Sequence, residues 1–247
     1  MNEEKLLIKL LSSNKNAANE SIMEIDWITY FRCVQSENID NPNAYNYFAE
    51  RLEVIRTIRD LFNAEKHFCD FLDNERKFIA GTLGKNQVKQ FGKGDSAFFG
   101  QMSGRGIFAS KIKSNDKKIS NALDKIPIKG NITKQNYDSF VEIFKDAFCG
   151  NMVRCASRLL AMKRPNFFVC VNSANRVGLK KDFDDIIPDK SFDNYWKFIQ
   201  KVHQSEWWKN PTPKTDIEKE VADARAAFLD SIYYDETTHY KKLKISY

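Results

Sequence analysis

Hydrophobic residues recur at steps of three and four along most of this chain, which is the spacing of a helix that buries one face. The pattern is clearest over residues 45–62, where the apolar positions are Phe48, Leu52, Ile55, Ile58, Leu61 and Phe62. The same rhythm predicts helices at residues 3–12, 16–34, 44–63, 65–80, 85–91, 105–113, 116–124, 134–147, 153–162, 174–182, 192–203 and 214–233. We therefore expect an all-α fold with few strands.

Clusters of turn-forming residues separate these segments. They lie at residues 38–43, 92–96, 126–131, 163–166 and 210–214, each rich in Gly, Pro, Asn or Asp. The chain has no internal repeat and no low-complexity tract. With 247 residues it is long enough to bury a core without a disulfide or a structural metal.

The cysteines and the chain start predict a compartment. The five cysteines are odd in number and never fall in a C-x-x-C spacing, which favours a reducing, cytoplasmic environment. The first residues are acidic and lack the charged-then-apolar pattern of a signal peptide. No apolar run approaches the roughly 20 residues that a membrane span needs. We expect a cytoplasmic protein without a membrane partner.

The charge is concentrated in the middle of the chain. The net charge is +6, from 39 Lys and Arg against 33 Asp and Glu. Between Lys85 and Lys134 there are 11 basic residues and only three acidic ones, Asp95, Asp116 and Asp124. This balance fits a polyanionic partner, and it fits a solvated helical face equally well.

The most informative stretch runs from Phe148 to Gly178. A Gly-Asn turn at 150–151 opens an amphipathic helix that ends before residues 163–165, and an apolar run follows at 167–171. Directly after that run come the polar residues Asn172, Ser173, Asn175 and Arg176. Polar side chains at the end of a buried run predict the edge of a cleft.

This stretch resembles the helix-hairpin-helix DNA glycosylases, whose signature is a helix, a tight L-P-G-V-G hairpin, a second helix opening with a small pair that ends in Ala, and a V-D motif. Residues 148–152 match the hairpin, Cys155–Ala156 match the small pair, and Val171–Asn172 match the V-D motif. Gly150 precedes Asn172 by 22 positions and Ala156 precedes it by 16, as in the endonuclease III and adenine-glycosylase branch. The motif match covers about thirty residues.

Three positions depart from the family pattern. Met152 replaces the second hairpin glycine. Arg154 stands where bifunctional members carry a Schiff-base lysine, and a guanidinium is too basic to act as that nucleophile, so lyase activity is disfavoured. Asn172 stands where the resemblance implies the catalytic aspartate. The chain is then either an inactive relative or an Asp-to-Asn form that holds substrate without turnover. We favour the second because the neighbouring residues are otherwise those of a working site, and we expect the form with Asn172 to be inactive.

A carboxylate at position 172 would have a clear chemical role. Cleavage of an N-glycosidic bond builds positive charge on the sugar, which a nearby anion stabilises, and the same group can orient the attacking water. Asn172 keeps the shape of that group without its charge. An alternative role for Asn172 is a helix N-cap that accepts hydrogen bonds from backbone amides near Asn175.

The resemblance also implies how DNA is held. Backbone amides in a turn that leads into a helix can bind a phosphate. The predicted DNA-binding residues are Gly150, Asn151, Met152, Val153, Arg154, Lys163, Arg164, Ser173, Asn175 and Arg176. Each cation taken alone is equally plausible as an ordinary surface residue, but their clustering favours a phosphate-binding surface.

Base chemistry inside a duplex requires the nucleotide to be flipped into a pocket lined by aromatic and polar groups. The glycine-rich stretch 97–108 offers the candidates Phe98, Phe99, Gln101, Met102 and Arg105. A role in the core and in turns is the more plausible explanation of its phenylalanines. The four-cysteine loop of iron-sulfur glycosylases is absent and no His, Cys and Asp residues show metal-ligand spacing, so we expect no cofactor and no metal.

In such a fold, residues 25–165 would form a helical barrel lobe that carries the hairpin, and residues 1–24 with 166–247 would form a companion lobe. A central cleft would hold the base. The predicted function is a monofunctional DNA glycosylase that acts as a monomer on double-stranded DNA with modified bases. The run at residues 159–171 also looks like a phage-defence glycosylase for glucosylated hydroxymethylcytosine. A base-excision repair enzyme, a non-catalytic binder of modified DNA and a helical interaction domain stay as alternatives.

Overall fold

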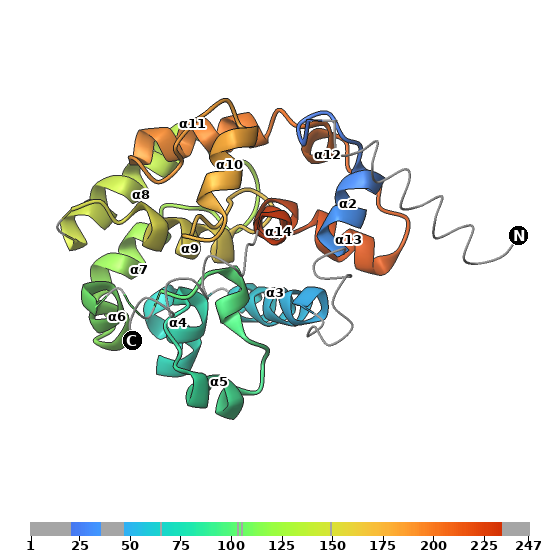
Figure 1. The fold of residues 1–247 in the computed structure, drawn as a ribbon. Coiled ribbons are helices and arrows are strands. Elements are labelled where there is room, and N and C mark those ends of the chain that lie inside the picture. Colours follow the sequence, from blue (N-terminus) through green and yellow to red (C-terminus); the bar gives the residue numbers. More distant parts are fainter. Residues whose placement is uncertain are drawn as a thin grey trace, which may run out of the picture.

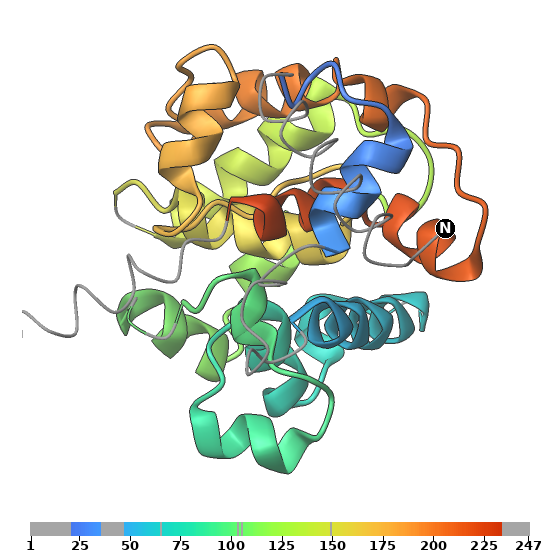
Figure 2. The same cartoon turned by 45° about the vertical axis from the view of Figure 1, so that its right-hand side comes forward.

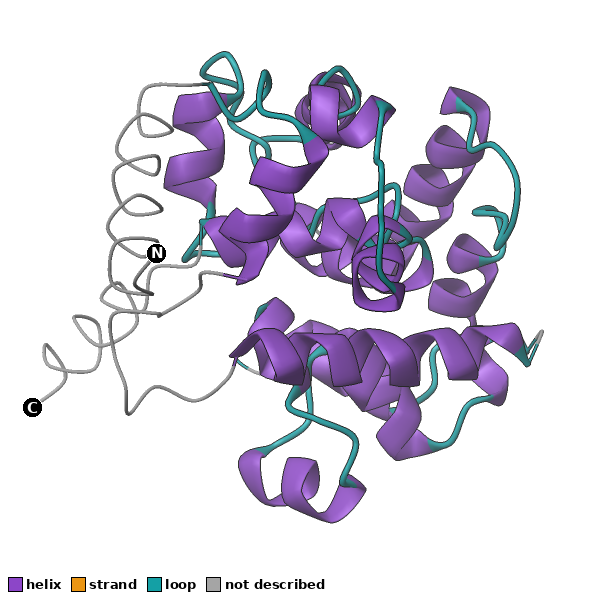
Figure 3. Ribbon diagram, turned by 90° about the vertical axis from the view of Figure 1, so that its right-hand side faces the viewer, coloured by secondary structure: helices purple, strands orange, loops and turns teal. Residues whose placement is uncertain are grey.

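The computed structural model describes residues 21–35, 47–64, 66–102, 104, 106–148 and 150–233. Within these ranges all regular structure is helical and no strand occurs, as Figure 3 shows. The all-α prediction is therefore confirmed for this part of the chain. The helix predicted at 3–12 lies outside the described residues, as does the start of the one predicted at 16–34.

Thirteen α-helices and two short 3-10 helices make up the described fold (Figure 1). They are α2 (Trp27–Gln35), α3 (Tyr47–Asn63), η1 (Phe68–Asp70), α4 (Asp73–Ala80), α5 (Lys85–Phe91), η2 (Ser96–Phe99), α6 (Gly106–Lys113), α7 (Lys117–Leu123), α8 (Lys134–Ala147), α9 (Val153–Lys163), α10 (Arg176–Asp182), α11 (Phe192–Val202), α12 (Glu206–Lys209), α13 (Asp216–Ala222) and α14 (Arg225–Ile232).

Side-chain caps explain several of these boundaries. Thr133 accepts a hydrogen bond from the Asn136 amide at the start of α8, and Thr215 does the same for Glu218 at the start of α13. Such caps satisfy amides that have no partner inside the helix. Two predicted helices are interrupted. The segment 65–80 breaks at Leu72, which is extended, and the segment 214–233 breaks at Ala224, whose φ of −131° is not helical.

Helix α9 lies at the centre of the molecule. Every residue from Cys155 to Lys163 is buried, and α9 contacts α3, α4, α7 and α14. Figure 2 shows α9 and α14 at mid-height, between α3–α5 on one side and α10–α11 on the other. A helix that is covered all round must satisfy its polar side chains inside the protein. This requirement decides the surroundings of Arg158, Lys163 and position 172.

Helix α2 packs against the C-terminal helices. The Tyr30 ring stacks on Trp207 with centroids 4.0 Å apart, and the Tyr30 hydroxyl donates to the Arg225 carbonyl. The Trp27 indole lies against Glu218 at 3.4 Å. Helix α2 contacts α12 and α14, and the division into lobes at residues 25 and 165 stays a prediction. In the described part of the chain no helix is both long and apolar enough to cross a bilayer.

Candidate functional site

The turn between α8 and α9 is held by the side chain of Asn151. Gly150 has a φ of +89°, a left-handed conformation that a residue with a Cβ rarely adopts. The Asn151 Oδ1 accepts from the Val153 amide at 3.2 Å, and its Nδ2 donates to the carbonyls of Asp189 and Lys190 at 3.0 and 2.7 Å. The turn is therefore tied to the loop that precedes α11.

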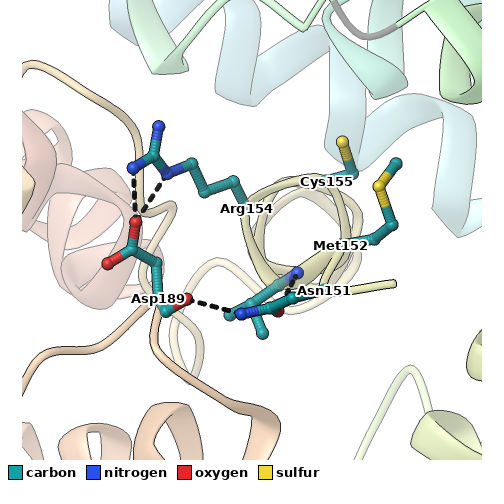
Figure 4. A pocket seen from close by; sticks show the side chains of 6 residues that line it. Asn151, Met152, Arg154, Cys155 and Asp189 are labelled. Atoms are coloured by element: carbon teal, nitrogen blue, oxygen red, sulfur yellow. Dashed lines mark hydrogen bonds and ion pairs between the residues drawn. The ribbon is translucent and has the colours of Figure 1, made fainter. Parts of the chain in front are cut away.

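A cavity of about 190 Å³ lies at the N-terminus of α9, lined by Asn151–Cys155 and by Asp189. The Arg154 Nε donates to the Asp189 carboxylate at 2.7 Å, as Figure 4 shows, and Arg176 approaches the same oxygen at 3.6 Å. Two guanidiniums thus share one carboxylate at a helix end that already favours anions. Asp189 has no motif around it, so sequence reasoning did not find it.

Position 172 is enclosed rather than open. Asn172 is 7% exposed. Its Oδ1 accepts from the backbone amides of Ala174 and Asn175 at 2.9 and 3.1 Å. These bonds close a turn that leads into α10, whose N-cap is Asn175, so Asn172 is not itself the helix N-cap that we considered as an alternative. Its Nδ2 donates to the Asp230 Oδ1 at 2.8 Å. Each end of the amide therefore has a partner within the protein, and an amide fits this position better than a carboxylate would.

Asn172 belongs to a buried polar cluster of five side chains, namely Arg51, Arg158, Asn172, Asn175 and Asp230. Arg51 and Asp230 form an ion pair at 2.8 Å with both side chains fully buried, and Asn175 donates to Asp230 as well. Arg158 donates to the carbonyls of Ile79, Ser96 and Phe78 at 2.9, 2.9 and 3.1 Å. Burial lowers the pKa of Arg158 to about 10, which still leaves it charged at neutral pH.

The segment predicted to line a base pocket covers this cluster. A Cβ on Gly100 would lie 3.0 Å from the Asn172 Cβ, so the backbone at residue 100 touches position 172 directly. The Cys170 thiol donates to the Phe99 carbonyl at 2.7 Å. The Phe99 ring has the guanidinium of Arg51 5.1 Å from its centroid. Two segments far apart in the sequence, 96–102 and 170–175, are therefore packed together.

The individual pocket candidates have different surroundings. Phe99 and Met102 are buried in the core, Phe98 is half-buried and Gln101 is exposed. Arg105 lies outside the described residues. In this conformation only Phe98 and Gln101 of the described candidates could meet a ligand without rearrangement of the core.

Two of the predicted phosphate contacts are turned inward. Lys163 donates through Nζ to the Leu123 carbonyl at 2.7 Å, and Arg164 donates to the carbonyls of Pro127 and Gly130 at 2.6 and 2.9 Å. These bonds hold the loop after α7, so neither head group joins the DNA-binding surface predicted at the α8–α9 turn. The physical reason is that α9 ends inside the molecule, where unpaired carbonyls need donors.

The remaining predicted DNA contacts divide in the same way. Ser173 and Arg176 are exposed, whereas Asn175 is fully buried. The Asn175 side chain accepts from the Asn172 backbone amide and donates to the Cys170 carbonyl and to Asp230.

Within the described residues no three His, Cys, Asp or Glu side chains are grouped to hold a metal.

Comparison with protein-family models, with curated proteins and with solved structures finds no match for this chain. The resemblance to helix-hairpin-helix glycosylases accordingly stays a prediction from residues 148–178. The geometry describes two features near this stretch, namely a cavity at the start of α9 bordered by the Arg154–Asp189 ion pair and a buried carboxylate, Asp230, in contact with position 172.

Proposed function

We propose that the chain is a monofunctional DNA glycosylase of the helix-hairpin-helix type. It would bind double-stranded DNA and hydrolyse the N-glycosidic bond of a flipped modified base, leaving an abasic site. The observation that carries this proposal is the contact between Gly100 and Asn172. It joins the segment proposed to meet the base with the position proposed to meet the sugar.

The α8–α9 turn is the proposed DNA grip. The Val153 amide at the start of α9 donates to the Asn151 side chain, and the cavity beside this helix end is bordered by Arg154. The Arg176 side chain is 48% exposed, and its guanidinium lies 3.6 Å from the Asp189 carboxylate that borders the same cavity. A phosphate that entered here would compete with Asp189 for both guanidiniums.

Asp230 is the proposed source of negative charge. Its carboxylate accepts a hydrogen bond from the Asn172 side-chain amide. An anion therefore lies next to position 172, where the family resemblance implies one. Both ends of the Asn172 amide are occupied and the backbone at Gly100 covers it. Catalysis therefore requires residues 96–102 to move when DNA binds, which exposes Asn172 to the flipped nucleotide.

The product of the reaction tests this proposal. The chain and its Asn172→Asp variant are incubated with duplexes that contain glucosylated hydroxymethylcytosine, uracil, an oxidised purine or only normal bases. We expect strand breaks on one modified duplex only after hot alkali, because an abasic site is alkali-labile. Since Arg154 replaces the lysine of bifunctional enzymes, borohydride should trap no protein–DNA adduct. Breaks before alkali treatment, or a trapped adduct, would contradict the monofunctional mechanism.

A second function is favoured by the burial of Asn172. A chain that recognises modified DNA without excision would need no exposed group at this position, and a fully bonded amide suits that role. The same assay separates the two functions. Retained binding to a modified duplex, with no alkali-labile site formed by either protein, identifies a non-catalytic binder.

The proposed grip can be tested by changing its charge in both directions. Arg176→Gln should weaken DNA binding and reduce the slope of log affinity against log salt by about one, because one phosphate contact is lost. Asp189→Asn should strengthen binding, because it removes the carboxylate that competes with phosphate. The control is Lys219→Gln on α13, an exposed cation away from the turn. Fluorescence anisotropy over a range of salt concentrations measures all four proteins, and equal slopes would refute the grip.

A further inference from the structure

A second cavity lies at the opposite end of α9. It has a volume of about 350 Å³ and is bordered by the end of α3, by residues 66–67, by the loop after α7 and by Lys163. Because α9 has 11 residues, its two ends are about 15 Å apart along the axis. This basic pocket is therefore separate from the cavity at the α8–α9 turn.

The pocket combines an apolar wall with a positive rim. Its wall includes Phe62, Ile126 and Ile128, and its charged lining contains the three lysines Lys66, Lys129 and Lys163. The single carboxylate in the lining, Asp124, is bonded to the Nδ1 of His67 at 2.8 Å. Three ammonium groups against one carboxylate leave a net charge of +2 with His67 neutral. The electrostatics favour an anion, and the wall favours an apolar body attached to it.

Lys163 contributes a buried cation to the lining of this pocket. It is 9% exposed, and its ammonium makes one hydrogen bond in the described structure, to the Leu123 carbonyl. An ammonium carries three N–H donors, so two remain for a ligand. Burial lowers the pKa of Lys163 to about 8. An anion bound here would accept hydrogen bonds from the unused N–H donors and would offset the cost of burying the charge.

A purely structural role accounts for only part of this arrangement. The bond to Leu123 anchors the last residue of α7 and explains why α9 ends in a buried lysine. It does not explain why Lys66 and Lys129, both exposed, border the same cavity. Like charges around a hollow repel one another, and an anion bound between them would relieve that repulsion.

We propose that the basic pocket binds a small organic anion, an apolar ring or chain of single-ring size that ends in a phosphate or a carboxylate. The anionic group would receive the free donors of Lys163 and would be flanked by Lys66 and Lys129. The ring would lie against Phe62, Ile126 and Ile128. This site is distinct from the DNA grip, and its occupation does not depend on glycosylase activity.

Pyridoxal 5′-phosphate is a suitable chemical probe in the molecules whose Lys163 is neutral, because Lys66 and Lys129 can hold its phosphate while its aldehyde reaches Lys163. Its aldehyde carbon forms a bond to a neutral lysine amine, water leaves, and borohydride then supplies hydride to reduce the imine to a secondary amine. At pH 8 about half of the Lys163 amines are neutral, compared with below about 1% for a lysine of ordinary pKa. We expect peptide mapping to show Lys163 labelled at least tenfold faster than exposed lysines. Pyridoxal without the phosphate should label it more slowly.

Protection and binding measurements separate the ligand classes. Phenyl phosphate and benzoate are titrated by calorimetry, and each is added before labelling, with inorganic phosphate as the ring-free arm. Tighter binding of either ring compound than of inorganic phosphate supports the pocket, and the better of the two identifies the anionic group. Affinity should fall as pH rises through 8, because Lys163 loses its charge there. Uniform labelling of lysines without protection by any of the three anions would overturn the proposal.

Surface variants keep the test independent of folding. Lys66→Gln and Lys129→Gln change exposed side chains that line the pocket, and each should weaken phenyl phosphate or benzoate binding at least threefold. Lys125→Gln is the matched control, because Lys125 is exposed on the same loop but does not line the pocket. If Lys125→Gln weakens binding as much as Lys129→Gln does, the ligand senses only the general positive charge of the surface, and the proposed site is wrong.

Discussion

Replacing Asp230 with Ala should lower the free energy of unfolding by about 3–5 kcal/mol, because the change leaves Arg51 charged and buried without its counter-ion. Asp230 and Arg51 are both fully buried and bonded at 2.8 Å. The substitution also removes the acceptor for the amides of Asn172 and Asn175. Urea denaturation, followed by the far-ultraviolet signal of the helices, measures the loss.

An exposed ion pair between α3 and a C-terminal helix provides the control. Arg56 and Glu220 are bonded at 2.7 Å, but their side chains are 47% and 27% exposed. Solvent screens such a pair, so Glu220→Gln should cost less than about 1 kcal/mol. If Asp230→Ala costs no more than Glu220→Gln, the cluster is not held by charge, and Arg51 must find another partner or become hydrated.

Most helices could be predicted because their evidence is local. The apolar spacing in residues 134–147 and 153–162 and the cap at Thr133 depend only on neighbours in the sequence. The predicted helices that are divided in the structure show the limit of this approach. Leu72 and Ala224 are ordinary helix residues by type. At Leu72 the Glu75 carboxylate accepts from the Leu72 amide and marks the start of α4, a local signal that the apolar spacing alone does not contain.

The buried polar cluster escaped prediction although the sequence contains part of its pattern. Arg51 shares a helix face with Ile55 and Ile58, a core position where a charge needs a partner. Arg158 lies within the apolar stretch of α9 in the same way. A charge at a core position therefore marks a buried partner, but the identity of that partner, Asp230, depends on contacts across about 180 positions.

The site residues illustrate the same division between local and tertiary information. The stretch 97–108 and the polar residues at 172–176 were both identified from the sequence as candidates, and the structure brings them into contact through Gly100 and Asn172. Lys163 and Arg164 were expected on the surface because they are charged and cluster with other cations in one short segment. Their burial follows from the position of α9 at the centre of the fold, which no local pattern predicts.

Asn172→Asp should destabilise the protein by about 1–3 kcal/mol, because it replaces a hydrogen-bond donor to Asp230 with a second carboxylate. The two side chains are 2.8 Å apart, a distance at which two carboxylates repel each other or share a proton. Urea denaturation at neutral pH measures the loss, with Asp230→Asn as the companion single variant.

The exchange of both residues completes a double-mutant cycle. Asn172→Asp combined with Asp230→Asn restores one amide and one carboxylate to the pair, with the carboxylate now at position 172. We expect a loss of stability smaller than the sum of the two single changes by about 1–3 kcal/mol. Additive losses would mean that the 172–230 hydrogen bond contributes little.

The exchanged protein also has a carboxylate where N-glycosidic cleavage needs one, so it should form abasic sites at least tenfold faster than the chain with Asn172. If it is more stable than the single variants and yet excises no base, position 172 holds the fold together and takes no part in catalysis.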